Sequence, residues 1–169
     1  MKRQKGFSLI ELLIVVAIIL IIAAIAIPNL MRSKMAANEA SAVGSMRTIN
    51  TSQVEYSTSW GTGYAAALGN LGGTVAACTA GAAAANACLI DPVLTTGTKS
   101  GYTFATAGTL PAGGVSNGFE VNGTPVTVGQ TGQRAFCSDQ SGVIRFNTTG
   151  AAIGVGAGTC AGVATVLGK

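Results

Sequence analysis

Histidine is absent from this 169-residue chain, and aspartate and glutamate together number only six. Without histidine, the chain lacks the commonest general base and a frequent metal ligand. The six acids are scattered along the sequence and form no cluster that suggests a paired general acid and base. We therefore expect no catalytic residues, no metal site and no cofactor.

Charge is also scarce, since charged residues make up 9% of the chain. Three of the ten basic residues, Lys2, Arg3 and Lys5, precede Gly6, which leaves seven bases against six acids and a net charge of +1 in the remainder. A balance so close to neutrality gives no sign of a specific nucleic-acid site. By the positive-inside rule, the leading cations instead predict that residues 1–6 stay cytoplasmic and that most of the chain lies on the opposite, extracytoplasmic side of the membrane.

One long apolar run dominates the sequence and contains an acid near its start. Residues 12–27 are apolar without a break, and with Phe7 as its start the segment of about 21 residues would span roughly 30 Å as a helix. A carboxylate costs on the order of 2.5 to 3.5 kcal/mol at the centre of such a helix and less toward its ends, so Glu11 is expected to have a cationic partner. The alternatives are a plain membrane anchor whose acid reaches the interface, or a secretory signal cleaved after Ala-Ile-Ala at residues 24–26.

The helical pattern continues beyond the apolar run. Pro28 removes one backbone donor, and we expect either a mild kink or a point where the helix can unwind locally. Farther along, apolar residues recur at steps close to 3.5, interrupted by Glu39 and Gln53. The apolar stripe consists of Met35, Ala42, Met46, Ile49, Tyr56 and Trp60. The pattern predicts one long helix with an apolar half, residues 7–28, and an amphipathic half, residues 29–60.

The remaining sequence consists of two regions that differ in composition. Residues 61–92 are rich in Ala, Gly and Thr, a composition that buries little and predicts a long connecting loop. Residues 93–169 contain short β-favouring runs between glycine-containing turns, and predict a small antiparallel sheet followed by a C-terminal loop. The predicted strands are residues 102–106, 118–122, 125–128, 134–137 and 143–147. With the amphipathic helix covering one sheet face, the fold class is α+β.

Four cysteines, Cys78, Cys88, Cys137 and Cys160, agree with an oxidising compartment outside the cytoplasm and allow three disulfide connectivities. We favour Cys78 with Cys88, because the short loop between them can close on itself. The other pair, Cys137 with Cys160, would pin the C-terminus to a strand. Buried free thiols are the alternative, and zinc is disfavoured because the chain has no histidine and no C-x2-C pair.

Several weaker patterns have simpler explanations. Residues 114–118 fit the G-x-S-x-G pattern of a nucleophile elbow, but we expect a glycine-rich turn there, and the chain has no histidine base. Asp91 and Asp139 lack the neighbouring acids of a calcium site, and turn chemistry explains Asp139 better. Three glycosylation sequons are interpreted as chance matches in a threonine-rich chain, at Asn50, Asn122 and Asn147.

Two short segments stand out near the start of the chain: Gly6-Phe7-Ser8-Leu9-Ile10-Glu11-Leu12-Leu13 and Ile27-Pro28-Asn29-Leu30. Together they resemble the N-terminus of prepilins of the type IV filament superfamily. The leader is of class III, and the chain is similar to type IVa major pilins. This resemblance implies the type IV pilin fold, a long N-terminal helix packed on a small antiparallel sheet. It also implies that a membrane prepilin peptidase removes residues 1–6 by cutting after Gly6 and methylates the new amino group of Phe7.

The resemblance supplies the missing cation for Glu11. In such filaments, the carboxylate of an incoming subunit is thought to neutralise the N-terminal ammonium of Phe7 in a neighbour, and two unfavourable charges in an apolar core become one pair. The implied product is a helical homo-oligomer, which starts in the inner membrane, uses a pilus assembly platform and becomes an extracellular pilus. The alternatives are a pseudopilin of a type II secretion system and a membrane-tethered binding domain that never polymerises.

Overall fold

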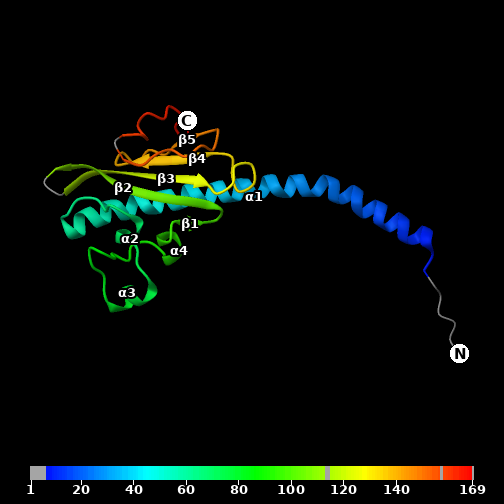
Figure 1. Ribbon diagram of the computed structural model, residues 1–169, viewed down its shortest axis with the longest axis horizontal. Helices are drawn as coiled ribbons and strands as arrows, with labels where there is room; N and C mark the ends of the chain where they lie inside the picture. Colours follow the sequence, from blue (N-terminus) through cyan, green and yellow to red (C-terminus); the bar gives the residue numbers. More distant parts are fainter. Residues whose placement is uncertain (1–6, 113–114, 157, 169) are drawn as a thin grey trace. The chain divides into compact units, whose positions relative to one another are not determined.

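The computed structural model in Figure 1 describes residues 7–112, 115–156 and 158–168. The chain divides into two compact units, Met1–Lys34 and Met35–Lys169. Helix α1, Leu9–Trp60, begins in the first unit and ends in the second. The predicted leader, residues 1–6, lies outside the described residues.

In the first unit, the described chain is almost entirely helical. The first turn is closed by the backbone N–H of Leu12, which donates to the Ser8 carbonyl at 3.2 Å. Pro28 lies inside α1 and does not end it, since a proline within a helix removes one donor while the neighbouring backbone bonds remain. The helix begins two residues after the predicted start at residue 7 and ends at the predicted limit, Trp60.

The second unit contains a five-stranded antiparallel sheet in which sequential strands are neighbours. Its two long strands form a hairpin in which Tyr102 lies opposite Pro125. Antiparallel pairing between neighbours needs only short connections, which the glycine-containing turns supply. The strands are β1 Thr98–Lys99, β2 Tyr102–Ala112, β3 Val115–Pro125, β4 Ala135–Asp139 and β5 Arg145–Asn147.

The structure corrects several predicted strand limits. The central strands β2 and β3 are longer than predicted, and the predicted strand at residues 125–128 is wrong because β3 ends at Pro125. The chain then turns: the Thr131 N–H donates to the Thr127 carbonyl at 2.9 Å, and Gly129 has a φ of +80°. Glycine adopts this left-handed conformation without steric cost, so a turn replaces the strand there.

The amphipathic half of α1 covers one face of the sheet (Figure 1). The predicted stripe forms the core, with Met46 and Ile49 fully buried and Met35 and Trp60 partly buried at its ends. On the sheet side, the largest fully buried side chains are Tyr102, Phe119 and Phe136. The 3.5-residue spacing therefore placed the packed face of this helix correctly.

The connecting segment is more structured than its composition predicts. Residues 61–92 contain α2, Leu68–Leu71, and α3, Val75–Ala80, and α4, Pro92–Thr95, follows directly. Most of its residues are exposed or half-buried, as the composition predicted, but Ala65, Leu68, Leu71 and Ala87 belong to the main core. These few apolar side chains anchor the Ala/Gly-rich stretch.

A second, smaller core lies on the sheet face turned away from α1, under the C-terminal loop (Figure 1). It contains Ala135 and Cys137 of β4 with Ile153 and Cys160 of the loop. Successive strand residues point to opposite faces, so Phe136, between these two, packs in the main core instead. All five residues of β4 are buried because both faces of this strand are covered.

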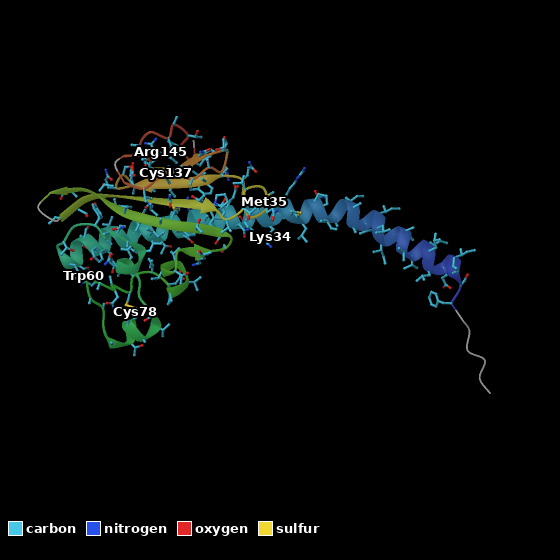
Figure 2. All side chains as sticks on the ribbon, in the orientation of Figure 1. Lys34, Met35, Trp60, Cys78, Cys137 and Arg145 are labelled. Carbon is cyan, nitrogen blue, oxygen red and sulfur yellow. A yellow bond between two sulfur atoms is a disulfide. The ribbon has the colours of Figure 1, made fainter. Side chains whose placement is uncertain are left out.

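Both disulfides have the connectivity that the sequence favoured, Cys78 with Cys88 and Cys137 with Cys160. Cys78 belongs to α3 and Cys137 to β4, and both residues are labelled in Figure 2. The first bridge is partly exposed and closes the loop that carries α3, whereas the second is buried and attaches the C-terminal loop to β4. Each bridge thus fastens a segment that has few apolar contacts of its own.

Candidate functional site

Glu11 lies in the first turn of α1, on an exposed surface. The unpaired N–H groups at a helix N-terminus favour a negative charge there. Among the described residues, no Lys or Arg nitrogen lies within 4.0 Å of the Glu11 carboxylate. Phe7, four residues earlier, is 78% exposed, while Gly6 lies outside the described residues. Within the described chain, Glu11 therefore has no ionic partner.

The surface around Glu11 is apolar on every side of the helix. Every large apolar side chain from Phe7 to Met31 is at least 44% exposed, and Figure 2 shows the side chains of this segment projecting all around the ribbon. An apolar surface this extensive indicates contact with lipid or with another protein. Helix α1 is also the one described helix that is long and apolar enough to cross a membrane.

The arrangement therefore combines an apolar helix surface, one acid near the helix start and a proline within the helix. Residues 1–27 match the model of the prokaryotic N-terminal methylation motif. Two curated relatives each match a part of the chain. In these segments, this chain is similar to type IV pilins. The α+β arrangement, a long N-terminal helix followed by a five-stranded antiparallel sheet, agrees with the type IV pilin fold.

The two relatives are similar to only part of this chain. The type IV wide pilus major component PilA4 of Thermus thermophilus is 59% identical over 39 residues, 23% of this chain and 30% of the relative. The type IV major pilin protein PilA of Myxococcus xanthus is 44% identical over 54 residues, 32% of this chain and 24% of the relative. The matches thus span less than a third of the length of either relative. No solved structure matches the chain.

Sequence reasoning missed the ion pair that, within the second unit, joins helix α1 to the segment that enters β4. Arg134 Nε and Nη2 lie 2.8 and 2.7 Å from Glu39 Oε2, and the backbone N–H groups of Gln133 and Arg134 donate to Glu39 Oε1 at 2.8 and 3.1 Å. The Arg134 guanidinium also lies over the rings of Phe136 and Phe146. Glu39, which interrupts the apolar stripe, is therefore a buried residue whose two carboxylate oxygens both accept hydrogen bonds.

The local environment changes the ionisation of two groups at this contact. Burial alone would raise the pKa of Glu39, but hydrogen bonds from the Gln133 backbone and from Arg134, together with the Arg134 charge, hold it below its ordinary value. Burial raises the pKa of the neighbouring Tyr102 phenol, the Glu39 charge raises it further, and the Arg134 charge opposes the increase. Glu39 thus remains ionised across the physiological pH range.

The second interruption of the stripe, Gln53, is also a buried contact. Its Nε2 donates to the Ala65 carbonyl at 3.1 Å and to Thr106 Oγ1 at 3.2 Å, and its Oε1 accepts from the Ala65 N–H at 2.8 Å. The side chain is fully buried. One amide therefore attaches α1 to both the connecting segment and β2, and satisfies backbone groups that would otherwise be buried without partners.

The structure also locates the weaker sequence patterns. The predicted turn at residues 114–118 is wrong for the described part, because Val115–Gly118 belongs to strand β3, and Gly114 lies outside the described residues. Asp91 caps α4 by accepting from the Leu94 N–H, and it pairs with Lys99 at 2.8 Å. The hydrogen bond from Lys99 is the main reason why the pKa of Asp91 is lowered.

The side chains of Asp139 and of the sequon residue Asn122 are both engaged in hydrogen bonds within the sheet unit. Asp139 accepts the backbone N–H of Ser141 at 2.8 Å in the turn after β4, which is the turn role expected for it. The amide nitrogen of the sequon residue Asn122 donates to the Ile153 carbonyl, and its oxygen accepts from the Ala105 N–H. The folded sheet therefore holds the Asn122 amide group in internal hydrogen bonds.

Proposed function

We propose that this chain is a structural subunit of an extracellular type IV pilus and polymerises through its N-terminal helix. The observation that supports this function is the methylation motif at residues 1–27 on a helix whose large apolar side chains from Phe7 to Met31 are all exposed. Burying that surface against identical helices would remove it from water or lipid. The proposed role is packing, with no catalytic step.

The proposed order of events begins with processing. A prepilin peptidase cuts after Gly6 and methylates the new N-terminus of Phe7, and this step removes the basic leader, residues 1–6. The first unit then carries one acid, Glu11, and one new ammonium group at Phe7. These charges are stabilised in an apolar filament core when the carboxylate of one subunit lies against the ammonium of its neighbour.

The remaining segments have proposed roles along the same pathway. Residues 7–28 hold the precursor in the inner membrane and later form the filament core, and Pro28 is a point where the helix can unwind during packing. Residues 29–60 attach the helix to the rest of the subunit, residues 61–92 form the connecting segment, and residues 93–169 form the sheet and C-terminal loop. A pilus assembly platform would extract the subunit from the membrane.

The test is the composition of sheared surface filaments. Electron microscopy combined with mass spectrometry is expected to find this chain in pili, with N-methylated Phe7 as its first residue. A chain that stays in the inner membrane would contradict the proposal and support a tethered domain. A short periplasmic fibre without surface pili would support the alternative, a pseudopilin of a type II secretion system.

A further inference from the structure

Glu120 is a buried acid outside the proposed assembly site. It lies in β3 and is 2% exposed. Directly opposite it on β4 lies a second buried acid, Asp139. Among the described residues, no Lys or Arg nitrogen lies within 4.0 Å of Glu120. Like charges directly opposite each other destabilise a sheet, so contacts elsewhere must account for the placement of this carboxylate.

Those contacts all come from the C-terminal loop beside the buried disulfide. The backbone N–H of Cys160 donates to Glu120 Oε1 at 2.9 Å. The Thr159 hydroxyl lies 2.8 Å from Glu120 Oε2 and 2.7 Å from the Gly154 carbonyl oxygen. Glu120 thus binds the residue that forms the disulfide and the residue before it.

The sheet register places Glu120 on the same sheet face as the other cysteine of this bridge, Cys137. Asn122, two residues along β3, pairs with Cys137 of β4. Residues i and i+2 of a strand share a face, and so do directly paired residues of neighbouring strands. Glu120 and Cys137 therefore lie on the same sheet face, the one that the C-terminal loop covers.

The loop itself has few apolar anchors. Among its described residues from Thr148 to Gly168, only Ile153 and Cys160 are buried apolar side chains. Two buried side chains do little to order a segment of this length. Val163 and Leu167 are partly buried against the two cores, and backbone hydrogen bonds join Thr165 to Phe146 and Leu167 to Ile144. Near Cys160 itself, the polar contacts are those of Glu120 with Cys160 and Thr159.

We propose that Glu120 is a positioning residue for oxidative folding, whose carboxylate holds Cys160 opposite Cys137 before the disulfide forms. In a glutathione buffer, one cysteine thiolate attacks glutathione disulfide and releases one reduced glutathione. The second thiolate then displaces the remaining glutathione and forms the S–S bond. Positioning raises the effective concentration of the second thiol, and hence the equilibrium constant of the bridge.

The test measures this constant for each bridge separately, with the full chain in detergent micelles. The Cys137–Cys160 pair is studied with Cys78 and Cys88 replaced by serine, and the Cys78–Cys88 pair in the reverse background. Glu120→Leu removes both acceptors and leaves the Cys160 N–H without its partner, and is expected to lower the Cys137–Cys160 constant about tenfold. The Cys78–Cys88 constant is expected to stay unchanged.

Three further variants separate positioning from general stability. Glu120→Gln keeps an oxygen for the Cys160 N–H and gains an N–H that can donate to the Thr159 hydroxyl, so it should restore a near-native constant. Thr159→Val, a milder change in case the leucine variant does not fold, should lower the constant about threefold. The matched control, exposed Glu55→Leu on α1, should change neither constant.

The proposal would be overturned by any of three results. The Cys137–Cys160 constant could be unchanged in both Glu120→Leu and Thr159→Val. Both bridges could weaken equally in Glu120→Leu, as expected of a general loss of stability. Finally, the Cys137–Cys160 constant could fall as far in Glu120→Gln as in Glu120→Leu, which would exclude the hydrogen bond to Cys160 as the reason for the loss.

Discussion

The two halves of helix α1 have the same backbone conformation and opposite surroundings. Up to Met31, every large apolar side chain is exposed, and the single acid has no partner among the described residues. Beyond Met35, the side chains of the apolar stripe pack in the core under the sheet, and the polar residues Glu39 and Gln53 are buried with hydrogen-bond partners. The second half completes its contacts within one chain, whereas the first half can complete them only with lipid or with other subunits.

The largest expected effect comes from removing the unpaired charge of the first half. Glu11→Gln should insert into the membrane and be processed normally, yet assemble no filaments, because the carboxylate can no longer pair with a neighbouring ammonium. Electron microscopy of sheared surface material, with mass spectrometry of the membrane fraction, measures both steps. Glu55→Gln, an exposed acid in the other half, is the control. Abundant filaments from the Glu11 variant would refute the pairing.

A matched pair of isoleucines compares the two halves directly. Ile49 is fully buried and Ile19 is 57% exposed, so Ile49→Ala should lower the free energy of unfolding of the second unit by about 3 kcal/mol and Ile19→Ala should leave it unchanged. The single tryptophan, Trp60, stacks on Tyr56 with 5.3 Å between the ring centroids. Its fluorescence can monitor denaturant unfolding in micelles. Equal losses in the two variants would contradict the difference in surroundings.

Breaking the Glu39–Arg134 pair tests whether the second half depends on its buried charges. Arg134→Leu leaves the Glu39 carboxylate without its cation and should lower the free energy of unfolding by about 2 kcal/mol. The double variant with Glu39→Gln removes the stranded charge and should recover part of that loss. If the double variant lost the sum of the two single effects, the residues would not be coupled.

The smallest expected effect is a pH dependence from the same pair. Because the pKa of Glu39 is lower in the folded state than its ordinary value of 4.5, its contribution to stability is present above that value and is lost as the pH falls through the folded pKa. The melting temperature should therefore fall more steeply below about pH 4.5 in the native chain than in Glu39→Gln. Parallel curves for the two proteins would exclude this contribution.

The sequence predicted those features that depend on neighbouring residues. The helix, its apolar first half and the packed stripe of its second half follow from periodicity, and the hairpin of β4 and β5 follows from the turn residues after Asp139. The strand at residues 125–128 was wrong because a proline without an N–H and a glycine with positive φ favour a turn there. The structure of residues 61–92 was missed because Leu68 and Leu71 gain their stability from a distant core.

The candidate site divides in the same way. Glu11, Pro28 and the methylation motif could be recognised from local sequence, because an acid or a proline within an apolar run stands out by itself. Glu39 and Gln53 were visible only as interruptions of a stripe. Their partners, Arg134, Ala65 and Thr106, could not be identified from spacing, since a side chain's hydrogen-bond partner is chosen by the folded geometry.

By itself, the sequence determined an apolar helix that carries one acid, because helix periodicity and hydropathy are properties of consecutive residues. Only the tertiary structure decided which polar side chains are satisfied. The contact of Glu39 with Arg134 and that of Glu120 with Cys160 join residues 95 and 40 positions apart. Burial makes such contacts necessary, because a polar group removed from water is stable only where the fold supplies its partner.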